Sequence, residues 1–262
     1  MGLTQTIHIF LPEVQSFLVL VSRIGGFLGA LPVFSGRTVP LKVKIALILV
    51  LGVALAPVIP RQTVSVDPLM LAGGLAAEML IGVTIGLVVR LFFGALELCG
   101  EVLGIQMGFG AAHLLDPTIS EQTPMMAQFL TMVASLVFLS LNAHLLVVAT
   151  IVNSYEAIPA FGAALPAALG EEVLRLSQQM FALGLKLAAP VMITILLINM
   201  LMAILGRAVS QINVFILSFP VTIAGGLLVL GLAMPFLVDL LIREIERLQL
   251  TIDALLKVLG HG

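Results

Sequence analysis

Long apolar runs, separated by short polar or proline-containing breaks, organise this sequence of 262 residues. Two runs occupy residues 14–31 and 45–59, and a third extends from Asp67-Pro68 to about residue 98. Three more follow at residues 125–152, 181–205 and 212–238. Because a helix needs about 20 apolar residues to cross a bilayer, the pattern predicts about six membrane-spanning helices.

Prolines and glycines interrupt almost every long run. Asp67-Pro68 and Thr123-Pro124 each place a helix-capping side chain before a proline, which suits the first position of a helix. Broken helices are stable at membrane depth only where protein or a water-filled cavity satisfies the freed backbone groups. The predicted fold class is therefore an all-α membrane protein, a bundle of long, Pro- and Gly-interrupted helices and helical hairpins.

The last part of the chain, residues 239–259, follows a different pattern. Apolar residues recur there at steps of three or four, which places them on one face of a helix: Leu241, Ile245, Leu248, Ile252, Leu255 and Leu259. Charged residues fill the other face. We expect an amphipathic helix that lies at the surface or docks on a partner.

The amino-acid composition excludes several classes of function. Hydrophobic residues make up 60% of the chain and charged residues 10%, with a formal net charge of -2. A soluble globule of this composition has too few polar groups to cover its surface, and there is no basic field to attract nucleic acid. No nucleic-acid partner, metal, cofactor or enzymatic activity is expected, since none of the common catalytic or metal-binding motifs occurs.

The charge distribution conflicts with a simple serpentine topology. Arg37, Lys42 and Lys44 form a basic connector, which the positive-inside rule places in the cytoplasm. Simple alternation would then place residues 97–121 on the same side, yet that region has four acidic residues and no Lys or Arg. Tryptophan is absent and only one tyrosine occurs, so the usual interfacial aromatic belt is missing. We infer that much of the apolar surface faces other protein rather than lipid.

Charges inside apolar runs are costly and usually face a bundle interior, an aqueous path or each other. Six such residues occur: Arg23, Glu78, Arg90, Glu97, Glu101 and Lys186. Arg90, Glu97 and Glu101 are spaced by seven and four residues, so they share one helix face. Three interpretations stay open for this predicted buried charge network: a closed ion-pair network, part of a proton path, or a helix-packing network within a complex.

Glycines recur at four-residue spacing in three places: Gly25 and Gly29, Gly82 and Gly86, and Gly100, Gly104 and Gly108. Such strips let helix backbones approach closely in a membrane. The last strip continues into a glycine-rich segment ending at Gly110, which also has the backbone freedom of a non-helical loop. The pattern alone fits a tight helix crossing and a flexible constriction equally well.

Several segments together resemble the FliR family of the flagellar type III export gate, which is related to the SctT proteins of injectisomes. Near the start, Pro32, Arg37-Thr-Val-Pro40 and Lys42-Val-Lys44 resemble the family's basic connector. The stretch from Gly100 to Pro117 resembles its most recognisable segment, and Asn142-Ala-His144 is similar to an Asn-Gly-His stretch. Residues 207–215, followed by Pro220, resemble an Arg-x-x-Pro-Gln-x-x-x-Phe pattern, with Ser210 at the place of its proline.

The resemblance implies one FliR-like membrane domain over residues 1–262. Residues 1–180 would be its FliP-like part and residues 181–262 its FliQ-like part, within a helical assembly of FliP and FliQ subunits that also meets FlhA, FlhB and membrane lipid. The assembly would lie in the bacterial inner membrane, in the flagellar basal body, and pass unfolded export substrates. Residues 105–115 would form a pore plug: Ile105, Gln106, Met107, Gly108, Phe109, Gly110, Ala111, Ala112, His113, Leu114 and Leu115.

The plug interpretation favours the constriction over the tight crossing. Met107, Phe109, Leu114 and Leu115 would supply apolar bulk that excludes water from the pore, while glycines would let the loop move. Two alternatives remain, an SctT-type subunit of an injectisome and, further off, an independent secondary transporter with a small-molecule site. A transporter would be stable alone and bind a solute, whereas a gate subunit would co-purify with FliP and FliQ.

Overall fold

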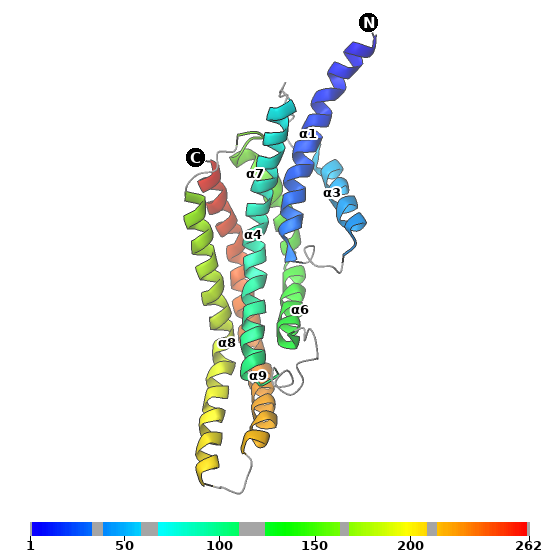
Figure 1. Ribbon diagram of the computed structural model, residues 1–262. Helices are drawn as coiled ribbons and strands as arrows, with labels where there is room; N and C mark the ends of the chain where they lie inside the picture. The colour runs from blue at the N-terminus through cyan, green and yellow to red at the C-terminus, as the bar shows by residue number, and fades with distance from the viewer. Residues whose placement is uncertain are drawn as a thin grey trace. The chain divides into compact units, whose positions relative to one another are not determined.

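The computed structural model describes residues 2–32, 39–58, 68–109, 124–162, 168–208 and 214–260. These residues are almost entirely helical, and no strand occurs among them. The helices are α1 (Gly2–Ala30), α3 (Leu41–Leu55), α4 (Pro68–Gln106), α6 (Met125–Ser140), α7 (Ala143–Ala157), α8 (Ala168–Ala208) and α9 (Val214–Gly260) (Figure 1). The predicted all-α membrane fold is confirmed.

Four helices are long and apolar enough to cross a membrane, namely α1, α4, α8 and α9, within the ranges that the structure describes. The number rises to five if the pair α6 and α7 is one broken span. The described residues thus hold fewer such helices than the six expected, because α3 has only 15 residues. The run at residues 125–152 is also not one continuous helix: α6 ends at Ser140 and α7 begins at Ala143, and between them Asn142 adopts a left-handed conformation with φ of 54°.

The chain forms two compact units, each built from separate stretches of sequence. Unit one comprises Met1–Leu91, Asn142–Leu176 and Glu246–Gly262, and unit two comprises Phe92–Leu141 and Ser177–Ile245. Helices α4, α8 and α9 each contribute to both units. The division at residue 180 that the resemblance implies follows the sequence instead, and it stays a prediction.

Glycine lets α1 and α4 approach closely in unit one. A Cβ atom on Gly82 of α4 would collide with the carbonyl oxygen of Arg23 and would lie 2.8 Å from the backbone nitrogen of Phe27. The facing glycine of α1 is Gly26, beside the backbone of Met79, whereas a Cβ atom on Gly29 would have no neighbour within 4 Å. The predicted strip at residues 82 and 86 is thus a true contact surface. On α1 the contact is made one residue away from the predicted strip.

The amphipathic segment at residues 239–259 is the end of α9, which is one continuous helix of 47 residues despite Pro220 and Pro235. All six residues of its apolar stripe are buried within the chain, from Leu241 to Leu259. Charged residues on the opposite side remain exposed, among them Arg243 and Lys257. The chain itself therefore covers the apolar face of this segment, and docking of the segment on a partner stays a prediction.

Candidate functional site: a buried ion pair and the start of the predicted plug

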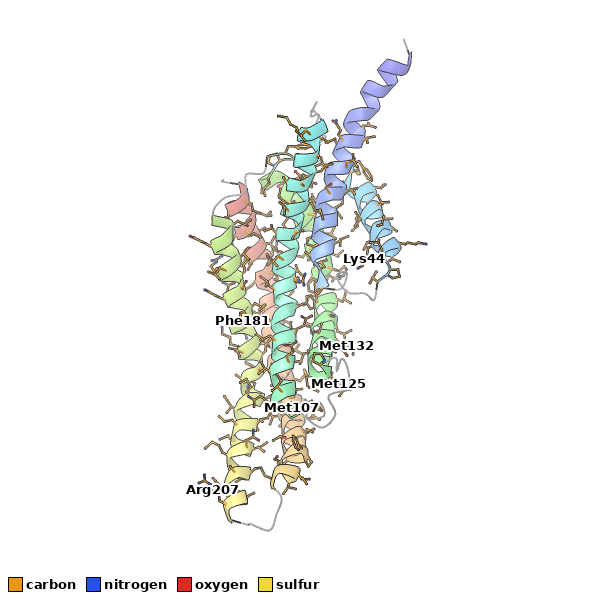
Figure 2. The ribbon with its side chains drawn as sticks, in the orientation of Figure 1. Lys44, Met107, Met125, Met132, Phe181 and Arg207 are labelled. Atoms are coloured by element: carbon orange, nitrogen blue, oxygen red, sulfur yellow. The ribbon has the colours of Figure 1, made fainter. Side chains whose placement is uncertain are left out.

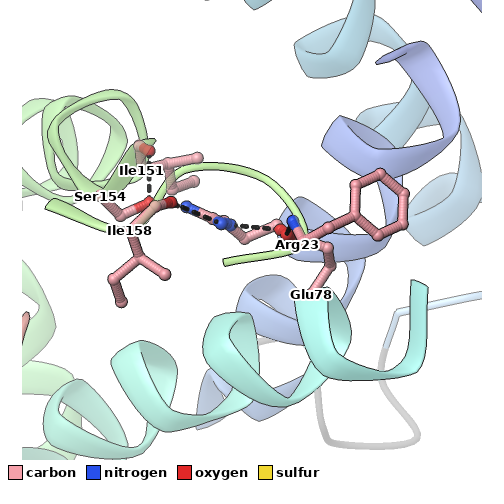
Figure 3. Close-up of polar contacts among 6 residues, drawn as sticks. Arg23, Glu78, Ile151, Ser154 and Ile158 are labelled. Atoms are coloured by element: carbon pink, nitrogen blue, oxygen red, sulfur yellow. Dashed lines mark hydrogen bonds and ion pairs between the residues drawn. The ribbon is translucent and has the colours of Figure 1, made fainter. Parts of the chain in front are cut away.

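Unit one contains an ion pair that is completely removed from solvent. The Arg23 Nε donates to Glu78 Oε2 at 2.7 Å, and both side chains are 0% exposed (Figure 3). The remaining guanidinium nitrogens donate to Ser154 Oγ at 2.9 Å and to the carbonyl oxygen of Ile158 at 3.1 Å. The pair therefore connects α1 and α4 to the end of α7.

Further contacts involve the second carboxylate oxygen of Glu78 and the face of the Arg23 guanidinium. The second oxygen of Glu78 accepts a hydrogen bond from the backbone N–H of Phe161 at 3.0 Å. The ring of Tyr155 lies beneath the guanidinium, 3.7 Å from Arg23 Cζ to the ring centroid. Buried charges are tolerated when they are paired and hydrogen-bonded. We call Arg23, Glu78, Ser154, Tyr155 and Ile158 the Arg23 cluster.

The Arg23 cluster has a structural role, because its contacts join separate segments of unit one. Its charges neutralise each other, and the Arg and Glu side chains have hydrogen-bonding partners within the chain. Phe161, whose backbone it binds, has φ of 62°, and its ring occupies the space beside Gly74 where a side chain would stand. The cluster thus fixes the path of the chain as it leaves α7.

Spacing along the sequence missed this pairing. Arg23 and Glu78 are recognisable as charges in apolar runs, but 55 residues separate them and they lie on different helices. The three charges that share one helix face, Arg90, Glu97 and Glu101, are instead exposed along α4. No ion pair joins them in the described part of the chain, so their burial in a network would require a partner.

Glu97 and Glu101 line an open groove on unit two, between α4 and α6. Polar residues of α6 form its other wall: Gln128, Thr131 and Ser135. The basic connector lies elsewhere, in unit one. Lys42 is exposed and Lys44 partly buried at the start of α3 (Figure 2), while Arg37 lies outside the described residues.

The structure describes the predicted plug only from Ile105 to Phe109, and residues 110–115 lie outside the described ranges. Helix α4 ends at Gln106, where Ile105 is 74% exposed and Met107 is 0% exposed (Figure 2). Met107 was expected to supply apolar bulk in a pore. In this chain it packs inside unit two, against α9.

A defined cap ends α4. The N–H of Phe109 donates to the Gly104 carbonyl oxygen and the N–H of Gly108 to that of Ile105, each at 3.0 Å. Gly108 has φ of 85°. This pair of hydrogen bonds around a left-handed glycine is the Schellman motif, in which a residue without Cβ is strongly favoured. We call residues 104–109 the α4 cap.

The glycine strip of this region serves more than one purpose. A Cβ atom on Gly100 would lie 2.4 Å or closer to backbone atoms of Ala127, so α4 and α6 cross tightly there. At Gly104 the nearest atom would be Met126 Cβ at 4.0 Å, which leaves room for a methyl group. The tight crossing is therefore real at Gly100, and Gly108 serves as a helix terminator.

Comparisons with known proteins agree with one another. The family described as "Bacterial export proteins, family 1" matches residues 14–248. Three relatives share the printed name "Flagellar biosynthetic protein FliR". The protein of Pectobacterium carotovorum subsp. carotovorum is 31% identical over 86% of each chain. That of Escherichia coli (strain K12) is 29% identical over 82% of each chain, and that of Bacillus subtilis (strain 168) is 29% identical over 84% of this chain and 86% of its own.

Proposed function

Because the chain belongs to the FliR family of bacterial export proteins, and is thus a multi-pass component of the flagellar export apparatus, we propose that it is a pore-forming subunit of the export gate. In this proposal it lies in the inner membrane, acts as a structural subunit without catalysis, and helps to pass unfolded flagellar proteins. The α4 cap is the observation that carries the proposal. It ends a 39-residue apolar helix at the segment where the resemblance expects a plug.

Apolar surface supports assembly with other subunits. Large apolar side chains are exposed along one face of α8, where they recur at steps of three and four: Ile193, Leu196, Leu197, Met200, Leu201 and Ile204. An exposed apolar surface of this extent marks an interface with protein or membrane. We propose FliP and FliQ as the subunits that cover it, with FlhA and FlhB as further partners.

The physical task of such a subunit is gating. A closed gate must exclude water and ions, and an open one must admit an extended polypeptide. Apolar side chains at a constriction exclude water, and Leu114 and Leu115 have suitable bulk. We propose that the residues after the α4 cap close the pore and move aside during export.

Deletion of residues 108–112 tests the pore role. The variant is purified with its co-purifying subunits and reconstituted into liposomes, where ion conductance is measured. We expect the variant to assemble with the same number of each subunit and the ion conductance to be clearly raised. Gly231→Ala is the matched control, because no atom lies within 4 Å of the added methyl group, and it should be as tight as the unmodified complex.

Two results would overturn the proposal. One is an assembled deletion variant that conducts no more than the control. The other is a native mass measurement in which the full-length chain is a stable monomer that binds a small solute, as expected for a secondary transporter. The names of the relatives favour a flagellar system over an injectisome.

A further inference from the structure

The cap that ends α4 is held against α9 by contacts that involve three α9 residues. We infer that residues 105–109 are a fixed base of the gate, positioned by Phe219, Thr222 and Gly226 of α9, and that they keep this position during export. This inference rests on the proposed function, because it assigns a fixed place in the proposed gate to the described start of the plug segment. All the residues involved belong to unit two.

The first contact is the side chain of Met107 lying directly on the backbone of α9. A Cβ atom on Gly226 would lie 2.8 Å from Met107 Cε, 2.9 Å from Cγ and 3.2 Å from Sδ. A methyl group at residue 226 would therefore force the methionine side chain to shift. Because Met107 is 0% exposed, leaving this site would expose its whole side chain and open a void in unit two.

The second contact joins the two backbones through Thr222. Its hydroxyl lies 3.3 Å from the Met107 carbonyl oxygen and also 3.0 Å from that of Ser218, one turn earlier in α9. A hydroxyl has one proton to donate, so these oxygens compete for it. The contact therefore stabilises the cap less than the packing of Met107 does. Its effect is to orient the Met107 carbonyl group.

The third contact limits what residue 108 can be. The ring of Phe219 stands beside Gly108, and a Cβ atom there would lie 2.9 Å from Phe219 Cδ1. A side chain at residue 108 is therefore opposed twice, by the left-handed backbone and by this ring. Residues 219, 222 and 226 follow at steps of three and four, so one face of α9 makes all three contacts.

These contacts argue against a hinge within residues 105–109. Three backbone hydrogen bonds close the cap, including one from the N–H of Met107 to the Leu103 carbonyl oxygen at 2.9 Å. Opening the base would break these bonds and lift Met107 from α9. During export we therefore expect residues 105–109 to stay on α9.

A disulfide can test whether the base moves. In Met107→Cys with Gly226→Cys, a sulfur at the place of Met107 Cγ would lie 2.9 Å from the new Cβ. This matches the distance of about 3 Å between a disulfide sulfur and the Cβ of its partner. The pair is made with Cys99→Ser in the assembled complex, and Met107→Cys with Gly231→Cys is the control.

We expect the first pair to cross-link under mild oxidation and the control pair to remain reduced. The cross-linked gate should stay as tight as the reduced gate and export substrate at an unchanged rate. The inference is overturned if the first pair does not cross-link, or if oxidation stops export and reduction restores it. If the deletion of residues 108–112 causes no leak while the disulfide forms, the fixed position of residues 105–109 on α9 is supported and the proposed gate function is rejected.

Hydrogen exchange provides a second measurement if the cysteine variants fail to assemble. In Gly226→Ala the new methyl group displaces Met107, so the amides of residues 107–109 should exchange about tenfold faster. Gly231→Ala should leave these rates unchanged. Equal exchange in the two variants would show that Met107 does not hold the cap.

Discussion

The Arg23 cluster of unit one and the α4 cap of unit two each contain a fully buried side chain, Arg23 and Met107, but different interactions hold them. In the Arg23 cluster, the two opposite charges of Arg23 and Glu78 pair with each other, and the guanidinium also donates to Ser154 and Ile158, across helices distant in the sequence. The α4 cap consists of local backbone hydrogen bonds and one apolar side chain that fits over a glycine. We therefore expect the Arg23 cluster to be destabilised by the loss of one charged side chain. The α4 cap should instead be destabilised by the addition of a side chain at one of its glycine positions.

The largest effect is expected from Glu78→Leu. It leaves the Arg23 guanidinium buried without its counter-charge, and breaking a buried pair in this way costs about 3–5 kcal/mol. We expect a large loss of assembled complex and a lower unfolding temperature. Gly73→Ala, on the same helix with no atom within 4 Å of the added methyl group, is the control and should behave like the unmodified chain.

The double variant Arg23→Met with Glu78→Leu sharpens this test. It removes both charges, and replacing a buried ion pair with apolar residues is often neutral or stabilising. We expect it to recover most of the lost stability. A double variant as unstable as Glu78→Leu would show that the hydrogen bonds to the end of α7 matter more than the charge balance.

An intermediate effect is expected from Gly108→Ala. A residue with Cβ costs about 1–2 kcal/mol in the left-handed conformation, and the methyl group would also press on Phe219. We expect a measurable fall in the unfolding temperature of the purified complex. Gly104→Ala lies in the same cap with room for a methyl group and should change it little; equal losses in both variants would contradict the proposed cap.

The smallest effect is expected from Asp239→Asn. Its carboxylate pairs with Arg243 at 2.8 Å, but the two side chains are 58% and 67% exposed. Exposed ion pairs contribute less than about 1 kcal/mol and often nothing measurable. An unchanged unfolding temperature would confirm that burial, and not the ion pair itself, gives the Arg23–Glu78 contact its importance.

Local patterns predicted much of this fold. Apolar runs gave the helical membrane class, and steps of three and four gave the buried stripe of α9 from Leu241 to Leu259. The four-residue glycine spacing correctly indicated close approaches at Gly82 and Gly100. These features depend on residues within one or two helical turns of each other, which a single sequence displays directly.

Such local patterns could not predict the contacts between segments that are distant in the sequence. Nothing in the spacing pairs Arg23 with Glu78, because the partner of a buried charge is chosen by the packing of helices. Sharing one helix face similarly did not bury Arg90, Glu97 and Glu101, which are exposed in this chain. The break at Asn142 was missed because the residues on both sides are equally apolar.

The α4 cap has a consequence for how sequences of this kind can diverge. Because the helix is stopped by its own last turn, residues can be inserted or removed after Phe109 without shifting the register of α4. An insertion before Gly104 would instead rotate every later residue of the helix about its axis and carry Met107 away from Gly226.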